Sequence, residues 1–537
     1  MSFTSFNFLA FLFAVIAVYY LVPKKLQWVV LLLASYGFYL STGADNVAYI
    51  LFTTLFTYGG GLLMQKLRDD NQAAVKALGA DVTKEQKREM KKVVAKKVRT
   101  VQVLTVLVNL GILIFIKASG FFITNFNRVF DLFAWDATLP MINIIAPLGL
   151  SYYTFNSIGY LVDVGRGKHD AERHLGKFAL FVSFFPSIVQ GPLFRYSDVG
   201  MQLQQPHSLE YNNLKFGAQL ILWGFFKKLV IADRVAPIVS AVFCADFMAT
   251  NFNGSQVFFG VLAYSFQIYC DFSGGTDITR GAAQMLGIEL PENFNQPFFA
   301  TSLADFWRRW HMSLGAWMRE FVFFPVMLSK PVTAISKQAR TRFGAYAGKI
   351  VPSVAAPLVV FFLIGIWHGI TWQYIANGLY NAIIISSSVA LAPAYAKLAK
   401  ALRVNTEAFS FRLFQMLRTF LVLCISRIIV KAPSLFDALR MIKRMFTTAS
   451  PDFLLGLDGK IFTYGVDAIE MRLLFVSILI LLVVGILRER GVKIRETLAK
   501  QGIIFRWAVI LALLVFVLVF GVYGPSYDAR DFIYGQF

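Results

Sequence analysis

The sequence predicts an all-α membrane protein that crosses the bilayer many times. Of its 537 residues, 57% are hydrophobic and only 15% are charged, a balance far from that of a soluble globular domain. Apolar stretches long enough to cross a bilayer also recur along the whole chain. Most of them are expected to be helices, because backbone that is exposed to lipid must satisfy its own hydrogen bonds.

Twelve apolar stretches are the candidates for these helices. The first has no basic segment before it and no small-residue cleavage site after it, so we expect it to remain in the protein as a permanent span. No linker rich in Ser and Pro and no repeat divides the chain, which predicts one membrane domain over residues 1–537. The stretches cover residues 6–22, 28–42, 47–65, 101–117, 143–162, 214–232, 255–272, 352–367, 372–392, 411–430, 471–487 and 503–524.

The distribution of Lys and Arg indicates the topology. The formal net charge is +21, but Lys and Arg collect in the cytoplasmic loops of multi-span proteins, so nucleic acid is not an expected partner. The segment 66–100 is a basic insertion that we expect in the cytosol, either as a helix beside the membrane that contacts anionic lipid headgroups or as a solvated connector. With this assignment both termini face the exterior. The other segments assigned to the cytosol are Lys24 and Lys25, 166–177, 330–349 and 488–500.

One apolar stretch is too interrupted to span cleanly. Between Phe181 and Tyr196 the run contains Pro186, Gln190 and Gly191. Such a segment is typical of a re-entrant loop, which a membrane protein tolerates only where protein or water surrounds the backbone.

Residues 301–319, TSLADFWRRWHMSLGAWMR, predict one amphipathic helix. Ser302 and Asp305 have the spacing of a capping box, so the helix is expected to start there. At about 100° per residue, the apolar side chains, four of them Phe or Trp, share an arc of roughly 120°. Arg308 and Arg309 lie outside this arc and are expected to reach lipid headgroups or the phosphates of a donor. The arc comprises Leu303, Phe306, Trp307, Trp310, Leu314 and Trp317.

Two histidines are the candidate catalytic residues. His368 lies in FFLIGIWHGITW, with no charged residue between Lys349 and Lys397. An ionisable group so deep in apolar sequence is costly and marks a functional site, and desolvation favours the neutral form that a general base needs. The alternative is a histidine that only packs against a neighbouring helix. His311, at the edge of the apolar arc, is expected to point inward, although for it alone a structural role is the stronger expectation.

Metal and nucleophile chemistry are not indicated. The histidines form no HxxxH or HExxH spacing, and no GxSxG elbow is present. Cys244, Cys270 and Cys424 are widely spaced and are expected to be core residues. Asp271 and Asp277 are intramembrane acids with Arg280 nearby, which favours a structural ion pair.

These motifs together resemble the membrane-bound O-acyltransferase family, in the bacterial branch that contains the alginate O-acetylation and teichoic-acid D-alanylation membrane proteins. The resemblance covers nearly the whole chain, and the two family histidines fall on His311 and His368. The tripeptide WHG alone would be weak evidence for this resemblance, whereas the full set of matching motifs is strong evidence. It consists of PLGLSYYTFNSIGYLVDVGRGK, FFPSIVQGPLFRYSD, WGFFKKLVIADR, YCDFSGGTDITRG, PENFNQPF, DFWRRWHMSLGAWMRE and GIWHGITW.

The resemblance implies a ring of transmembrane helices, with re-entrant and interfacial helices around a thinned centre where a cytosolic and an extracellular funnel meet. It implies an acyl thioester donor from the cytosol, acetyl-CoA or an acyl carrier protein, and no permanently bound cofactor. His368 would be the base and His311 would orient the donor or act as a second acid–base group. The candidates for donor binding or support are Arg308, Arg309, Trp307, Trp310, Trp367, Asp271 and Gln190.

The C-terminal tail, residues 525–537, resembles a short motif of this branch in which two Phe flank a Tyr. Here these residues are Phe532, Tyr534 and Phe537. The resemblance implies that Tyr534 carries the acyl group transiently outside the cell, and a phenol, with a pKa near 10, is a good leaving group for onward transfer. The alternative is an aromatic anchor for a frayed terminus.

The leading hypothesis is O-acylation, with acetyl as the expected group, of an extracellular polymer at the bacterial plasma (inner) membrane. An extracellular SGNH-type acyltransferase is the partner that the resemblance implies, alongside membrane lipid and the cytosolic donor. The alternatives are D-alanyl transfer to teichoic acid, a transporter or flippase that makes no covalent change, and an inactive scaffold. A transporter would favour paired, Gly/Pro-broken segments in two halves of the chain, and only the 181–196 run has that character.

Overall fold

The computed structural model describes residues 1–41, 43–78, 83–141, 147–244, 247, 250, 252–454, 456–457 and 459–523. Within these residues every regular element is a helix, and the only β-type pairing is an isolated bridge between Phe294 and Trp310. The all-α prediction is confirmed.

The described chain contains two compact units. Unit 1 comprises residues 1–218 and 279–291, and unit 2 comprises residues 219–278 and 292–537. The expectation of one membrane domain stays a prediction. The functional residues described below lie within unit 2.

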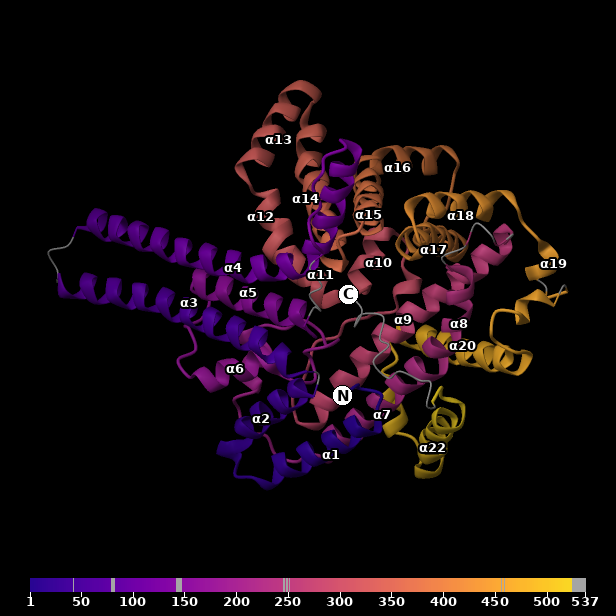
Figure 1. The fold of residues 1–537 in the computed structure, drawn as a ribbon, viewed down its shortest axis with the longest axis horizontal. Coiled ribbons are helices and arrows are strands. Elements are labelled where there is room, and N and C mark those ends of the chain that lie inside the picture. The colour runs from indigo at the N-terminus through magenta and orange to yellow at the C-terminus, as the bar shows by residue number, and fades with distance from the viewer. Residues whose placement is uncertain are drawn as a thin grey trace. The chain divides into compact units, whose positions relative to one another are not determined.

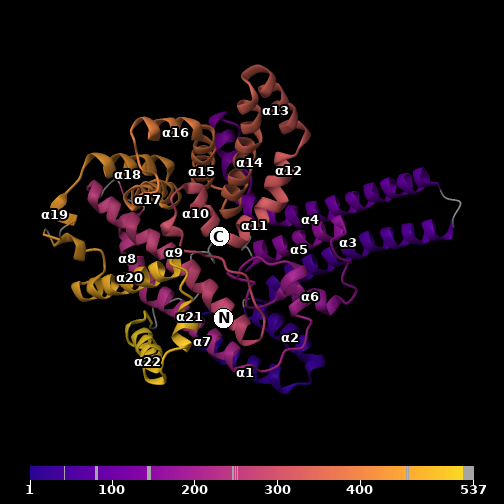
Figure 2. The same cartoon turned by 180° about the vertical axis from the view of Figure 1, so that it is seen from behind.

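Unit 1 is dominated by a pair of long helices. Helices α3 and α4 run beside each other as an extended hairpin (Figure 1), and the view from behind shows the same pair (Figure 2). The elements of unit 1 are α1 (Phe6–Leu21), η1 (Lys24–Leu26), α2 (Gln27–Leu40), α3 (Ala44–Ala77), α4 (Lys84–Leu132), α5 (Leu150–Arg166), α6 (Leu175–Ser183) and the short π-helix η3 (Tyr196–Gly200).

The basic segment 66–100 is not one separate helix. Its residues continue α3 to Ala77 and begin α4 at Lys84, where Thr83 and Gln86 form a capping box. The prediction of a single helix was wrong because the apolar runs on either side propagate directly into the charged sequence, which has good helix formers and no breaker in either arm.

The interrupted segment of unit 1 is buried without being helical. Helix α6 ends at Ser183 and π-helix η3 starts at Tyr196, and almost every residue between them is buried, Gln190 completely. Side chains of other helices satisfy part of this backbone: Phe185 N–H donates to Ser35 Oγ (3.1 Å) and Phe194 N–H to Asn156 Oδ1 (3.3 Å). Irregular backbone surrounded by protein is what the pattern predicted.

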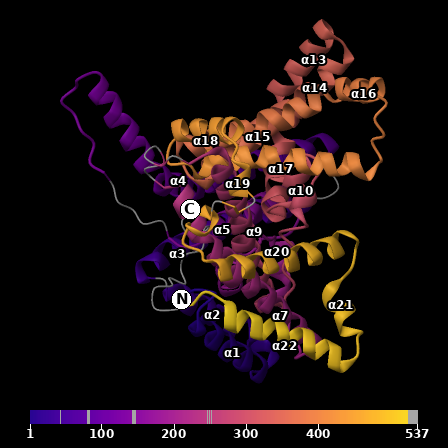
Figure 3. The ribbon, with the colours of Figure 1, turned by 90° about the vertical axis from the view of Figure 1, so that its right-hand side faces the viewer.

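Unit 2 contains the remaining elements. Figure 3 shows α20 and α22 from the side, in yellow, with α17 and α14 in orange above them. Two helices, α7 (Tyr211–Phe225) and α9 (Gly254–Met285), have residues in both units. The others are η4 (Phe226–Ala232), α8 (Asp233–Val242), η5 (Pro297–Phe299), α10 (Leu303–Arg309), α11 (Met312–Met318), η6 (Arg319–Phe323), α12 (Phe324–Met327), α13 (Lys330–Phe343), α14 (Ala345–His368), α15 (Trp372–Ala390), α16 (Ala392–Ala401), α17 (Phe409–Lys431), α18 (Leu435–Thr447), α19 (Pro451–Leu454), η7 (Lys460–Phe462), α20 (Ala468–Glu489), α21 (Ile494–Ala499) and α22 (Ile503–Phe520).

The helices present apolar side chains outward, as expected for a protein whose solvent is lipid. In α22 only Val517 is buried, although the helix is almost entirely apolar. Every one of the twelve apolar stretches contains a helix. Fewer helices of the described chain are long and apolar enough to cross a bilayer: six, or seven if the bent pair α15–α16 counts as one span. The other stretches form shorter helices, such as α1 with 16 residues, or helices with too many polar residues.

Candidate functional site

The predicted helix over residues 301–319 is broken at its centre. Helix α10 ends at Arg309 and α11 starts at Met312, and His311 between them has a left-handed backbone (φ 46°, ψ 52°). The start was predicted correctly, because Ser302 caps α10 by accepting the N–H of Asp305 (3.1 Å). A left-handed conformation is uncommon for a residue other than glycine and is maintained only where the surroundings impose it.

The segment 293–295 imposes this break. Asn295 N–H donates to Arg309 O (2.9 Å) and Met312 N–H donates to Asn293 O (3.0 Å), so the backbone around Trp310 pairs with a distant segment instead of continuing the helix. The single-helix prediction was wrong because periodicity reports only local preference, and this pairing is formed by residues far along the chain.

Asn293 also positions the His311 ring. Its Oδ1 atom lies 3.1 Å from His311 Nδ1 and accepts the Ser313 N–H (3.1 Å) and the Ser313 hydroxyl (2.9 Å). Asn293 is 1% exposed and His311 2% exposed. Burial, together with the neighbouring His368, holds the pKa of His311 well below its ordinary value. Burial therefore favours the neutral form of the imidazole, and the contact with Asn293 restrains the orientation of the ring.

His368 is the last residue of α14. The chain turns at Gly369 and α15 begins at Trp372, after Thr371 caps it by accepting the Tyr374 N–H. The sequence placed this histidine deep in apolar surroundings, whereas the structure places it half-buried at a helix end. A helix end with a turn leaves space beside the ring, which a position in the middle of a packed helix would not.

Trp367 lies close to both histidines. Its ring centroid is 6.0 Å from that of His311 and 4.5 Å from that of His368. The structure therefore brings the two histidines that the sequence singled out close to the same tryptophan ring.

Each histidine lines a different pocket. The His311 pocket has a volume of about 210 Å³ and is mostly apolar, with Arg308 and Arg319 also among its lining residues. The His368 pocket is smaller, about 50 Å³. Because four side chains belong to both linings, the two pockets adjoin and share part of their wall. This shared wall consists of Trp307, Trp310, Phe361 and Ile364.

The His368 pocket carries a hydrogen-bonded polar cluster. Trp307 Nε1 donates to Asn381 Oδ1 (3.0 Å), and Asn381 Nδ2 donates to Asn377 Oδ1 (3.1 Å), which also accepts the Ser426 hydroxyl (2.6 Å). These residues come from α10, α15 and α17. Arg427 lies on the same pocket, with its guanidinium 4.9 Å from the centroid of Trp310.

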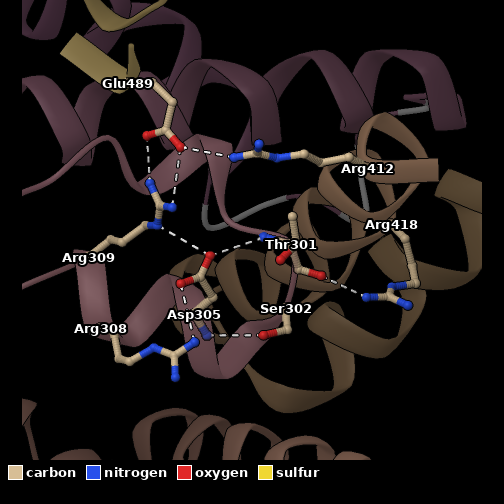
Figure 4. A network of polar contacts seen from close by, with 8 residues as sticks. All are labelled: Thr301, Ser302, Asp305, Arg308, Arg309, Arg412, Arg418 and Glu489. Atoms are coloured by element: carbon tan, nitrogen blue, oxygen red, sulfur yellow. Dashed lines mark hydrogen bonds and ion pairs between the residues drawn. The ribbon is translucent and has the colours of Figure 1, made fainter. Parts of the chain in front are cut away.

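A network of charged residues anchors α10. Figure 4 shows Arg309 pointing toward Glu489 and Asp305. Arg309 lies 2.7 Å from Glu489 of α20 and 3.2 Å from Asp305, and Arg412 of α17 reaches the same Glu489 at 3.3 Å. Arg308 contacts Asp305 (3.3 Å) and remains exposed. Arg309 was expected to reach lipid headgroups or donor phosphates. It instead forms ion pairs within the protein, because Glu489 of α20 lies within its reach.

Asp271 and Asp277 form buried ion pairs with lysines of η4. Lys228 Nζ lies 2.6 Å from Asp271 and 2.8 Å from Asp233, and Lys227 Nζ lies 2.7 Å from Asp277. The sequence pointed to Arg280 as the nearby cation, whereas these lysines are the ion-pair partners in unit 2. None of the three acids lines either pocket.

Several predicted residues lie elsewhere. Gln190 belongs to unit 1. Phe532, Tyr534 and Phe537 fall outside the described residues. Among the described residues, no group of three or more His, Cys, Asp or Glu is arranged to hold a metal, and Cys244, Cys270 and Cys424 are not in disulfides.

Sequence reasoning missed several residues of the site and of the ion pairs in unit 2, and some of them carried a signal. Lys227 and Lys228 in WGFFKKLVIADR and Arg427 in the run 411–430 are cations within apolar sequence, and such groups need partners or a use. Asn293 lies in PENFNQPF, a quoted motif whose role was not assigned. Asn377 and Ser426 carried no distinguishing signal, because an uncharged polar residue in a membrane helix is common.

The arrangement suits acid–base chemistry on a group held at the shared wall. One imidazole, contacted by Asn293, lines an apolar pocket large enough for an extended arm, and a second imidazole lines a smaller pocket that is also mostly apolar but carries a polar cluster. A reacting carbonyl at the shared wall would lie near both histidines, each of which lines one of the two pockets.

Comparisons with known proteins identify the family. Residues 165–426 match the family model of the membrane-bound O-acyltransferases. The chain is 30% identical over 448 residues to the probable alginate O-acetylase AlgI of Azotobacter vinelandii, covering 82% of this chain and 78% of that protein. It is 30% identical over 375 residues to the peptidoglycan O-acetyltransferase of Helicobacter pylori (64% of each chain), and 32% identical over 254 residues to the teichoic acid D-alanyltransferase of Bacillus subtilis (46% of this chain, 60% of that protein). The chain is a membrane-embedded acyltransferase and belongs to the membrane-bound O-acyltransferase family.

Proposed function

We propose that the protein transfers a small acyl group from a cytosolic thioester to a hydroxyl acceptor for O-acylation of a cell-surface polymer. The observation that carries this proposal is the pair of histidines close to Trp367, each lining one of two pockets that share four lining residues. The relatives named as O-acetylases of alginate and peptidoglycan support a polymer as the final acceptor and acetyl as the group.

The donor arm fits the His311 pocket. This pocket is the larger of the two and mostly apolar, and Arg308 and Arg319 offer cations to the phosphate groups found on coenzyme A or a phosphopantetheine carrier. His311, neutral and fixed by Asn293, would orient the thioester.

His368 acts as the general base in this proposal. The acceptor oxygen attacks the thioester carbonyl carbon while His368 takes the hydroxyl proton, a carbon–oxygen bond forms, and the carbon–sulfur bond breaks. The imidazolium then returns the proton to the departing thiolate. A thioester is already activated, so positioning and proton transfer are the main contributions that the protein must make.

Onward transfer is proposed to use the tail. The acyl group would pass to Tyr534, then to a serine of an extracellular SGNH-type partner, and then to the polymer. This part is supported by the resemblance of the tail and by the predicted exterior position of the C-terminus at the plasma membrane.

Proteoliposomes with a labelled acyl pantetheine thioester test the proposal. The wild-type protein should cleave the thioester and transfer the label, His368→Ala should do neither, and His169→Ala, a loop histidine of unit 1, should behave as wild type. Label that crosses the membrane still attached to its thiol would instead establish a transporter. Retained cleavage by a folded His368→Ala protein would remove the base from the mechanism.

The tail step has its own measurement. Mass spectrometry of the C-terminal peptide from protein made in its native host should detect the acyl group on Tyr534. In Tyr534→Phe this adduct should be absent and polymer acylation should stop, because the transfer then lacks its acceptor hydroxyl. Labelled polymer in that variant would refute the relay.

A further inference from the structure

Asn377 offers the His368 pocket an amide donor that a substrate can use, and the inference drawn from it rests on the proposed function. A carbonyl that is attacked by a hydroxyl acquires a negatively charged oxygen, and a fixed N–H group beside this oxygen lowers the barrier. We infer that Asn377 is a further catalytic residue, whose Nδ2 atom donates a hydrogen bond to the thioester oxygen as that oxygen becomes charged.

Helix α15 carries Asn377 on the face that lines the His368 pocket. The lining residues of this face have helical spacing: Tyr374, Asn377, Gly378 and Asn381. The ring centroid of Tyr374, one turn before Asn377, lies 6.1 Å from that of His368. Asn377 and the proposed base therefore border the same space.

Hydrogen bonds from α10 and α17 determine which way the Asn377 amide faces. The indole N–H of Trp307 can only donate, and it donates to Asn381 Oδ1 (3.0 Å). The other end of that amide, Asn381 Nδ2, donates to Asn377 Oδ1 (3.1 Å), which also accepts the Ser426 hydroxyl (2.6 Å). Because the oxygen of Asn377 faces this cluster, its Nδ2 atom faces the other way.

The Nδ2 atom of Asn377 remains available as a donor. Within the described part of the chain no acceptor bonds to it, yet it is not one of the polar atoms that are sealed inside the protein without a partner. Asn377 itself is partly exposed and lines the pocket. The donor is therefore open to a group that occupies the pocket.

The two helix backbones hold Asn377 in a fixed position relative to His368. Gly378, the next residue, packs directly on α14, since a Cβ added there would lie 2.5 Å from Phe361 O. Helix α14 ends at His368, so this close contact joins the helix of the base to the helix of the donor. A donor that is fixed before the reaction needs no reorganisation when charge develops.

The donor acts on one atom in the proposed step. As the acceptor oxygen bonds to the carbonyl carbon and His368 takes its proton, an electron pair of the carbonyl bond moves onto the carbonyl oxygen. Asn377 Nδ2 donates a hydrogen bond to this oxygen and keeps its own proton. The pair then re-forms the carbonyl bond, the carbon–sulfur bond breaks, and the departing thiolate receives the proton from His368.

The test removes the donor and keeps the acceptor. Asn377→Asp has nearly the same shape, and its carboxylate can still accept the bonds from Asn381 and Ser426, but it has no N–H for the thioester oxygen. With acetyl pantetheine and the detergent-solubilised full chain, the turnover number should fall by on the order of 100-fold. The KM should change by less than about threefold, because this bond is made chiefly in the transition state.

Asn253→Asp is the matched control. Asn253 lines neither pocket, and its Oδ1 accepts the Gln256 N–H (3.0 Å), so the same exchange of atoms leaves this bond intact. The variant should keep the wild-type turnover number.

Infrared difference spectra measure the hydrogen bond itself. The His368→Ala protein should bind acetyl pantetheine, labelled with carbon-13 at the carbonyl, without turning it over. A hydrogen bond weakens the carbonyl bond, so the band of the bound thioester should lie at a lower frequency than that of the free thioester. Adding Asn377→Asp should move the band back toward the free value, whereas a change in stability alone would not.

The outcomes separate the two proposals. If the wild-type protein cleaves no thioester above the His368→Ala background, the proposed function is wrong. If Asn377→Asp keeps the wild-type turnover number, or if the carbonyl band is the same with and without Asn377, acyl transfer stands and the role of Asn377 is refuted. If Asn377→Asp does not fold, Asn377→Leu, which has a similar size and also lacks the donor, replaces it in both measurements.

Discussion

Replacing Asn293 by Ala should impair the function of His311, although the histidine itself is unchanged. The Oδ1 atom of Asn293 accepts two hydrogen bonds from Ser313 and contacts His311 Nδ1. The substitution removes all three contacts and leaves buried donors without an acceptor. At about 1 kcal/mol for each contact, and more where a buried donor stays unsatisfied, the free energy of unfolding should fall by about 3 kcal/mol.

The same substitution should also lower the rate of acyl transfer. His311 keeps its left-handed backbone only while the 293–295 segment pairs with the residues around it. With the ring no longer fixed, the turnover number should fall by roughly tenfold to 100-fold, because loss of orientation removes part of the advantage of a positioned group. The KM for the thioester should change little, since the apolar walls of the His311 pocket remain.

The measurement pairs thermal unfolding in detergent with single-turnover thioester cleavage. Asn253→Ala is the matched control: its Oδ1 also accepts a backbone N–H, that of Gln256 at 3.0 Å, but it belongs to neither pocket. It should lose stability while keeping its turnover number. An Asn293→Ala protein that is folded and has the wild-type turnover number would refute the positioning role.

Three other perturbations test the account of the fold and of the site. Lys228→Met should destabilise the protein by about 3–5 kcal/mol, since it removes the cation that pairs with the buried Asp271, which is 1% exposed, and with the partly buried Asp233; an unchanged unfolding temperature would contradict a stabilising role for these ion pairs. Because the pKa of His311 is lowered in the folded state, the unfolded chain binds a proton at a higher pH than the folded chain does. The free energy of unfolding should therefore be highest above about pH 6.5 and fall below it, by up to about 1.4 kcal/mol per pH unit. His311→Gln should show a shallower decline, and an identical pH profile in both proteins would contradict the assignment. Glu489→Gln should weaken two ion pairs and cost about 1–2 kcal/mol, with a smaller loss of activity than Asn293→Ala; a loss as large as that of a histidine variant would mean that Glu489 acts in the reaction itself.

The helices themselves were predictable because each follows from local composition. Apolar runs in lipid must be helical, and the cap at Ser302 was visible from its spacing to Asp305. The number of spans was harder to predict. Helix α1 is apolar but too short for a full span, and α9 is long enough but too polar.

The site was predictable only in part, because its decisive contacts join distant residues. His311 and His368 could be chosen as rare ionisable groups in apolar sequence, and the structure brings both to Trp367. The break at His311 depends on pairing with Asn293, which no periodicity reveals. The walls of the His368 pocket combine α10, α14, α15 and α17, so neither its size nor the place of Arg427 follows from any single motif.

The central claim is that both histidines serve one acyl-transfer step. Single-turnover transfer rates of His311→Ala, His368→Ala and the double variant test this claim most directly, because residues that act as one unit have effects that do not add. The account predicts that the double variant is about as slow as the slower single variant. A double variant whose loss equals the product of the two single losses would show that the histidines act independently, and would contradict a shared site.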